Sequence, residues 1–237
     1  MQSLAARPRK SLLAPTLFAL FGGALLIALG TWQVQRLHWK EGLIAARDAA
    51  VHAPPIALPR TLAEAESEEF RHVRVEGRFL AAPEFHVHAL SQAGDDGYHA
   101  VNAFALAVGG IVLVDRGFVP VGGAAAAPPK DAGSVTGLLR LAQGKPSWFT
   151  PDNRPGTNEW FYVDPAAMAA AGALSGVLPF YVDADAGPDP RAYPVGGQTP
   201  LDLPNNHLQY AITWYALAAA LAIYYVLVVR RARRGGM

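Results

Sequence analysis

Two long runs without a charged residue constrain this chain more than any other feature. They cover residues 12–29 and residues 210–229. With its flanks, each run has about the 20 residues that an apolar helix needs to cross the hydrocarbon core of a bilayer. A core helix of a large soluble protein can show the same pattern. However, the charged residues that flank both runs favour two transmembrane helices, and the positive mean hydropathy of +0.16 agrees.

The first run could instead be a cleaved signal peptide, because Arg7, Arg9 and Lys10 precede it. It is longer than the apolar region of a typical signal peptide. It also passes directly into a segment with Trp32 and Arg36, which is typical of a membrane–water interface. We therefore predict that it is a retained anchor.

The basic residues of the two tails predict the orientation. Arg and Lys are concentrated in the cytoplasmic flanks of membrane proteins, and both tails of this chain are basic. The expected order is a cytoplasmic tail (1–11), a first transmembrane helix (12–34), an extracytoplasmic domain (35–207), a second transmembrane helix (208–229) and a basic cytoplasmic tail (230–237). In a bacterium this is a two-span protein of the cell inner membrane with its central domain in the periplasm.

Composition and motifs exclude several functions. The formal net charge of +1 gives no basic field for nucleic acid. The chain has no cysteine, so it forms no disulfide, binds no copper through thiolates and attaches no c-type haem. Serine-hydrolase, zinc-protease and nucleotide-binding motifs are also missing from the sequence. We therefore expect a protein that is not an enzyme.

The central region predicts short strands with turn signals between them. The first helix should run on to about residue 50, where Pro54 and Pro55 end it. Thr61 and Glu64 fit a capping box that opens a short helix, and Asp164 with Pro165 fits the start of another. Strands are expected at 72–79, 84–90, 98–108, 111–120, 135–141, 159–163 and 178–182. This pattern predicts an α+β membrane protein whose mainly antiparallel β domain, barrel-like or sandwich-like, lies between the two transmembrane helices.

His86 and His88 form an H-x-H pair on one expected strand and would point to the same side. Such a pair can bind zinc, but the sequence offers no third ligand nearby. The default expectation is a solvated or hydrogen-bonded face.

The remaining candidates lie where the two membrane segments meet water. The set comprises Trp32, Gln33 and Arg36 after the first segment, and His207, Tyr210 and Trp214 before the second. If residues 205–215 are helical, the last three share one face. The two segments cross in opposite directions, so both groups lie at a similar depth. They could form a haem pocket, with aromatic walls, an imidazole for the iron and a guanidinium for a propionate. They could equally be an ordinary belt of interface residues.

These residues also carry a family resemblance. Residues 30–40, 112–120 and 206–215 resemble the signature blocks of the Surfeit-locus (Shy-type) cytochrome c oxidase assembly factors. Residues 137–140, 149–153 and 158–161 fit the family pattern in the right order between them. Asp115 and Phe118 depart from it, because Asn and Trp are expected there.

The resemblance implies a function and a set of site residues. The protein would bind haem a transiently and assist its insertion into subunit I of a haem–copper (aa3-type) oxidase, with haem a synthase as a further partner. His207 would be the iron ligand, and Trp32, Gln33, Arg36, Tyr210 and Trp214 would line the pocket. His38 and Tyr210 both remain possible as a second axial ligand. The alternative is a protein-only scaffold that stabilises an oxidase assembly intermediate without touching haem.

Overall fold

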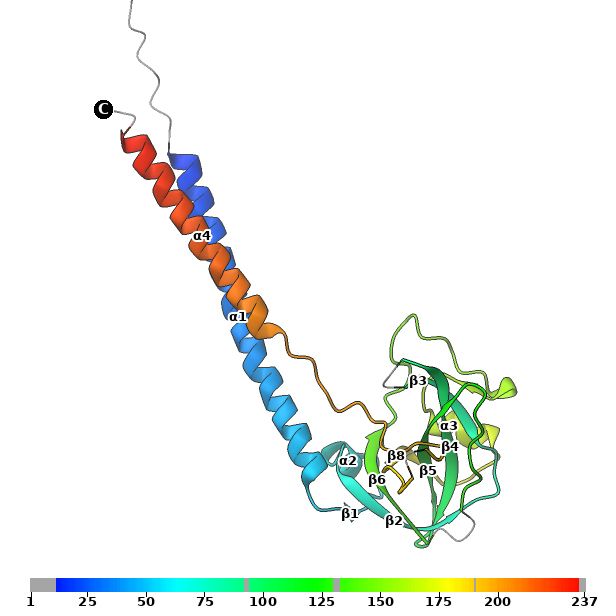
Figure 1. Ribbon diagram of the computed structural model, residues 1–237. Helices are drawn as coiled ribbons and strands as arrows, with labels where there is room; N and C mark the ends of the chain where they lie inside the picture. Colours follow the sequence, from blue (N-terminus) through cyan, green and yellow to red (C-terminus); the bar gives the residue numbers. More distant parts are fainter. Residues whose placement is uncertain (1–11, 92–93, 130–132, 190, 235–237) are drawn as a thin grey trace, which may run out of the picture. The chain divides into compact units, whose positions relative to one another are not determined.

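The computed structural model describes residues 12–91, 94–129, 133–189 and 191–234. The predicted cytoplasmic tail, residues 1–11 with its three basic side chains, lies outside the described residues. The chain divides into two compact units. The helix unit combines the residues up to Ala45 with those from Asp202 onward, and the β unit is Ala46–Leu201 (Figure 1).

The helix unit contains most of α1 (Leu13–His52) and all of α4 (His207–Arg234). At 1.5 Å per residue the two helices are about 60 Å and 42 Å long. They lie side by side and antiparallel, so that the start of α1 and the end of α4 are at the same end of the pair (Figure 1). Both are long and apolar enough to cross a membrane. Helix α1 ends at His52, just before Pro54 and Pro55, which confirms the predicted helix end.

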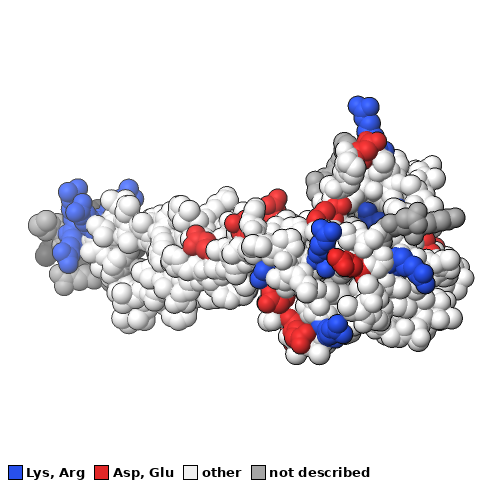
Figure 2. Space-filling view, turned by 90° about the horizontal axis from the view of Figure 1, so that it is seen from below, with Lys and Arg blue, Asp and Glu red and all other residues white. Residues whose placement is uncertain are grey.

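The surface of the helix unit agrees with two membrane spans. Large apolar side chains are exposed along both helices, including Phe21, which is 76% exposed, and Ile223, which is 62% exposed. Figure 2 shows this surface as a long uncharged stretch, with Lys and Arg gathered at the end that carries Arg231, Arg233 and Arg234. Such exposure is costly in water and favourable in lipid.

The β unit is built around a closed five-stranded barrel. Its strands are β2 (His72–Phe79), β4 (Asp96–Leu106), β5 (Ile111–Pro120), β6 (Ser134–Leu141) and β8 (Val177–Ala184). They pair in the order β2–β6–β8–β5–β4, and β4 pairs with β2 to close the ring. Strands β3 (Phe85–Leu90) and β7 (Glu159–Trp160) extend the sheet beyond β4, and β1 (Ile56–Ala57) lies beside β2. The short elements are α2 (Leu62–Ser67), α3 (Pro165–Ala171) and the 3₁₀ turn Pro155–Thr157.

Two apolar cores explain why β4 and β5 are buried on both faces. Along a strand, side chains alternate between the two sides of the sheet. Val112 and Val114 of β5 accordingly join the core inside the barrel with Phe104, whereas Leu113 joins a second core with Trp160. Both faces of β5 are therefore apolar here, which accounts for the continuous hydrophobic run from residue 111 to residue 114.

The predicted architecture is confirmed: apolar helices at the two ends of the described chain flank a β-rich barrel domain in the sequence. Thr61 and Glu64 form the predicted capping box, and Asp164 accepts a hydrogen bond from the backbone of Ala167 at the start of α3. Three strand pairs are parallel, namely β1–β2, β3–β7 and β5–β8, so the sheet is mixed in detail. The pattern missed β1 and made β7 too long. Neither strand exceeds two residues, which is too short to show a period.

Candidate functional site

The seam between α1 and α4 positions the candidate residues. From its start to Tyr225, the better-shielded positions of α4 are His207, Ala211, Trp214, Ala218, Leu221 and Tyr225, which are spaced alternately by four and three. This is the spacing of helices that pack along their length. Small residues allow a close approach: a Cβ on Gly30 would come within 2.8 Å of the Tyr215 ring, and one on Gly22 within 3.2 Å of Leu221.

Hydroxyl contacts fix the register of the two helices. Thr16 Oγ1 and the Tyr225 hydroxyl lie 2.7 Å apart, and Thr31 Oγ1 and the Tyr215 hydroxyl lie 3.1 Å apart. Hydrogen bonds between side chains of neighbouring helices add to packing in lipid, where few other polar partners exist. The residues that follow the first membrane run and those that precede the second therefore meet at the same level.

His207 is the first residue of α4, and its imidazole contacts α1 directly. Its Nδ1–H donates to Gln33 Oε1 at 2.7 Å. The bond fixes the tautomer, because a neutral imidazole that carries its proton on Nδ1 has a free lone pair on Nε2. Among the described residues, Nε2 has no hydrogen-bond partner. A ring held at one nitrogen and open at the other is the usual arrangement of a histidine that binds a metal.

The structure places the other predicted residues at different distances from this pair. Trp214 is half-buried on the seam, two turns along α4 from His207. Tyr210 is 55% exposed and Trp32 is 54% exposed. The guanidinium of Arg36 lies 3.7 Å from the centre of the Trp39 ring, and its side chain is exposed. Hence His207 and Gln33 are in contact, whereas Trp32, Arg36 and Tyr210 face outward.

The angular positions of these exposed residues around each helix show on which side of the seam they lie. At 100° per residue, Gln33 and Arg36 leave α1 on one side of the pair, about 60° apart. In an antiparallel pair the same side of α4 carries Tyr210 and Trp214. The contact between Thr31 and Tyr215 lies on the opposite side. One flank of the helix pair thus carries the imidazole, an amide, two aromatic rings and a guanidinium, and Trp32 lies further round α1.

Comparison with known proteins identifies the family. The sequence model of the SURF1 family matches residues 20–219, a range that includes both halves of the seam. Surfeit locus protein 1 of Mus musculus is 37% identical over 90% of this chain and 76% of its own length. The chain belongs to the SURF1 family. The human Surfeit locus protein 1 is 36% identical over 81% of this chain and 70% of its own length. The SURF1-like protein of Monosiga brevicollis is 36% identical over 88% of this chain and 85% of its own length.

A second polar site, in the β unit of this SURF1-family chain, was not predicted. His99, Asp115, Asp183 and Arg140 come from four adjacent strands, β4, β5, β8 and β6. His99 Nδ1–H donates to Asp115 Oδ2 at 2.6 Å, and Arg140 Nη1 donates to Asp183 Oδ2 at 3.1 Å. The Thr199 hydroxyl also donates to Asp183, at 2.5 Å. Charged residues within otherwise apolar strands were the signal that could have revealed this cluster.

Burial and like charge set the protonation of this cluster. Burial, together with the negative charge of Asp115, raises the pKa of Asp183 to about 6, although Arg140 and Thr199 oppose the change. Burial opposes a positive charge on His99. The hydrogen bond to Asp115 and the charges of Asp115 and Asp183 outweigh it, so the pKa of His99 is raised. His99 and Asp183 therefore retain their protons more strongly than they would in water.

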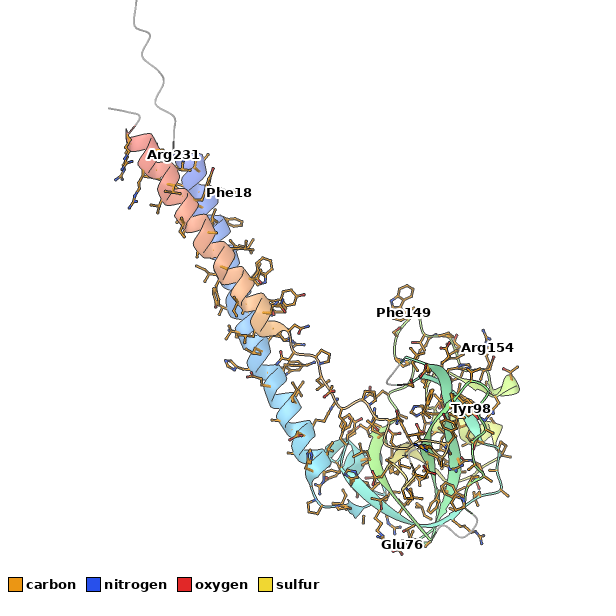
Figure 3. All side chains as sticks on the ribbon, viewed as in Figure 1. Phe18, Glu76, Tyr98, Phe149, Arg154 and Arg231 are labelled. Atoms are coloured by element: carbon orange, nitrogen blue, oxygen red, sulfur yellow. The ribbon has the colours of Figure 1, made fainter. Side chains whose placement is uncertain are left out.

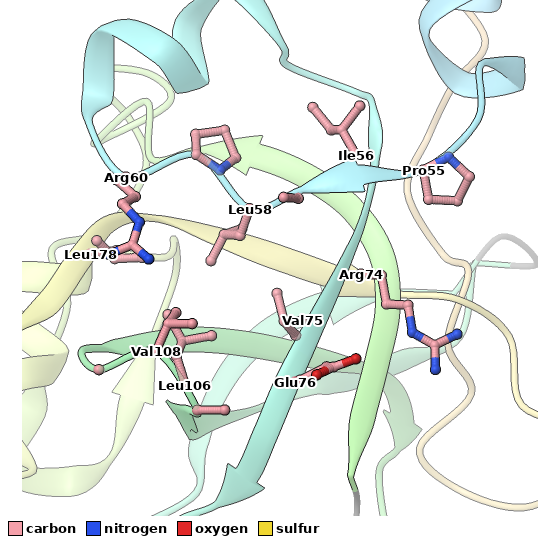
Figure 4. Close-up of a pocket in the computed structure, with 14 residues that line it drawn as sticks. Pro55, Ile56, Leu58, Arg60, Arg74, Val75, Glu76, Leu106, Val108 and Leu178 are labelled. Atoms are coloured by element: carbon pink, nitrogen blue, oxygen red, sulfur yellow. The ribbon is translucent and has the colours of Figure 1, made fainter.

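The β unit contains several cavities. The cluster borders one of about 280 Å³. Another, of about 600 Å³, is mainly apolar and lies between β1 and the β4–β5 turn, with Ile56, Leu58, Val75 and Leu106 in its walls (Figure 4). His86 and His88 line a third, of about 670 Å³, and His86 stacks on Tyr98 while His88 stacks on Phe161. Among the described residues no group of three or more His, Cys, Asp or Glu side chains is arranged for a metal ion.

Proposed function

We propose that this protein assists the assembly of a haem–copper oxidase by holding haem a at the boundary of its two membrane helices. The observation that carries the proposal is the His207–Gln33 contact, which leaves Nε2 open at a half-buried position. Membership in the SURF1 family supports it. The partners would be subunit I, which receives the haem, and haem a synthase, which supplies it.

The residues at the helix boundary suit the chemistry of such a guest. Haem a would bring an iron that accepts a nitrogen ligand, a broad apolar macrocycle and acidic propionates. His207 Nε2 would serve as the ligand, and Gln33 would hold the ring in place. Trp214 and Tyr210 would offer aromatic surface on the same flank. Arg36 makes no ion pair within the described residues, so its guanidinium is available to a carboxylate.

We also propose an orientation. Arg231, Arg233 and Arg234 close α4, and the positive-inside rule puts this end in the cytoplasm. Because the start of α1 lies at the same end of the pair, both termini would be cytoplasmic. The β unit would then lie on the outer face of the inner membrane, in the periplasm of a bacterium.

The deciding experiment is an absorption spectrum of detergent-purified protein made together with haem a synthase. The wild-type protein should carry haem a in a defined ratio, and His207→Ala should lose it. His52→Ala is the matched control, because His52 is an exposed histidine at the far end of α1 and should leave the spectrum unchanged. His38→Ala and Tyr210→Phe test the two possible second axial ligands. An unaltered spectrum in His207→Ala, or no haem in any preparation, would refute haem binding and favour the protein-only scaffold.

A further inference from the structure

The loop between β6 and β7 presents two large aromatic side chains to water. Trp148 is 91% exposed and Phe149 is 74% exposed, and their rings meet edge to face with centres 5.7 Å apart. No other large hydrophobic side chain in the described β unit is as exposed as Trp148. Aromatic side chains of this size are seldom left fully in water without a function, because burying them contributes more than burying almost any other residue.

The loop is built to hold this tip in place. Pro146 and Pro151 bracket it, and proline restricts the backbone on both sides. Lys145 Nζ donates to Asp152 Oδ1 at 2.7 Å, which ties the two ends of the loop together. The backbone N–H of Thr150 also donates to the Ser147 carbonyl, closing a tight turn under the two rings. The aromatic side chains are thus displayed in advance of any contact, which lowers the entropy cost of binding.

Chain connectivity keeps this end of the β unit within reach of lipid. Gly144 and Pro146 of the loop line the 280 Å³ cavity together with Thr199 and Pro200. Seven residue steps join Pro200 to His207, the first residue of α4, and an extended chain spans at most about 25 Å over that number. A bilayer crossed by α4 is therefore tethered close to the loop, and tethering raises its effective concentration.

We propose that Trp148 and Phe149 insert into the headgroup layer of the membrane that the two helices cross. The chemistry of the tip fits a lipid interface. Trp is enriched there because its ring is apolar while its N–H remains wet, and Phe supplies apolar area without a polar group to satisfy. The ion pair at the base leaves the loop without excess charge, so insertion would not bury an unpaired ion. The contact would steady the β unit on the membrane surface. It goes beyond haem binding and does not depend on it.

Spin labelling can test the contact directly, because the chain contains no cysteine and each introduced cysteine is unique. Phe149→Cys carries a nitroxide at the tip. Val108→Cys, 68% exposed on the β4–β5 turn, is the matched control. Figure 3 shows Phe149 at the opposite end of the β unit from Glu76, which lines the same cavity as Val108. The full-length protein is placed in phospholipid nanodiscs, and relaxation by oxygen is compared with relaxation by a water-soluble nickel chelate.

The label at position 149 should be protected from the nickel chelate and relaxed by oxygen, whereas the label at 108 should show the reverse. Adding Trp148→Ser to the Phe149→Cys variant should return the label to water. This change is expected to leave the fold intact, since Trp148 is almost fully exposed. If the chelate reaches positions 149 and 108 equally in nanodiscs, the proposal is wrong. It is also wrong if protection appears only after membrane proteins are added, which would indicate a protein partner. The haem spectrum of each variant separates this result from failure of the proposed function.

Discussion

Replacing Asp183 by asparagine should remove much of the pH dependence of the stability of the β unit. Asp183 is buried beside Asp115, its register partner on β5, and its pKa is raised from 3.8 to about 6. Between these pH values the folded state binds more protons than the unfolded state, so the free energy of unfolding falls as pH rises. The stabilisation is complete below about pH 4 and lost above about pH 6. The raised pKa of His99 extends the same trend above pH 6.5.

The size of this effect follows from the two pKa values. One pKa unit corresponds to about 1.4 kcal/mol, so the difference is worth about 3 kcal/mol. An asparagine side chain would keep an oxygen for Thr199 and Arg140 but could not ionise. Relative to the wild type, Asp183→Asn should therefore gain about 3 kcal/mol between pH 4 and pH 7. For a unit of the size of Ala46–Leu201 this corresponds to about 9 °C in melting temperature.

Scanning calorimetry of the full-length protein in nanodiscs, from pH 4 to pH 8, measures this difference. Comparing each variant with the wild type at every pH cancels the other titrating groups. Asp96→Asn, which replaces an exposed carboxylate in the same unit, is the control and should show a nearly constant difference. If the difference between Asp183→Asn and the wild type is equally constant, Asp183 does not hold a proton in the folded protein, and the reasoning fails.

Three further substitutions test other parts of the structure. Gln33→Leu removes the hydrogen-bond partner of His207 Nδ1 but keeps His207 itself. It should weaken haem a binding roughly 10–100-fold in a titration. An unchanged affinity would show that the contact does not position the ring. Gly117→Ala should destabilise the β unit by roughly 3 kcal/mol, because φ of Gly117 is +114° and the new Cβ would lie 2.0 Å from the Val195 carbonyl oxygen. A variant that melts at the wild-type temperature would contradict this. Thr61→Ala breaks the capping box of α2 and should cost about 1 kcal/mol, or about 3 °C in the same melt, whereas Thr61→Ser should retain the cap.

Local signals predicted most of the elements because they act within a few residues. Consecutive prolines ended α1, a capping box opened α2, and Asp164 with Pro165 opened α3. Strand order could not be predicted in this way. Strands β5 and β8 pair in parallel although 56 residues separate the end of one from the start of the other, and no local pattern encodes such a partner. The sequence pattern therefore predicted the strands, whereas their order in the barrel depends on packing between distant segments.

The sequence predicted the level along the helix pair at which the candidate residues lie, but not which side of each helix faces the other. Two spans that cross in opposite directions must bring residues near 33 and 207 to the same level, and the structure does so. Which side of each helix faces the other depends on close packing. Here Gly30 packs against the Tyr215 ring, and glycines on a membrane helix are a known sign of a close interface. Tyr210 and Arg36, which were expected to line one pocket with His207, have exposed side chains on the same flank of the helix pair.

The two histidine sites differ in a way that bears on haem. His99 is hydrogen-bonded to the carboxylate of Asp115 on the neighbouring strand. The cavity beside it has about 280 Å³, which is below the range of cavities that hold drug-sized molecules. His207 has a neutral amide partner and one nitrogen without a hydrogen-bond partner among the described residues. A carboxylate partner favours a charged imidazolium, whereas a neutral amide leaves the imidazole free to bind a metal. Introducing Gln33→Glu should therefore make haem a binding by His207 weaken at a higher pH than in the wild type. Spectral titrations in which the wild type and this variant lose haem at the same pH would show that the amide has no such role.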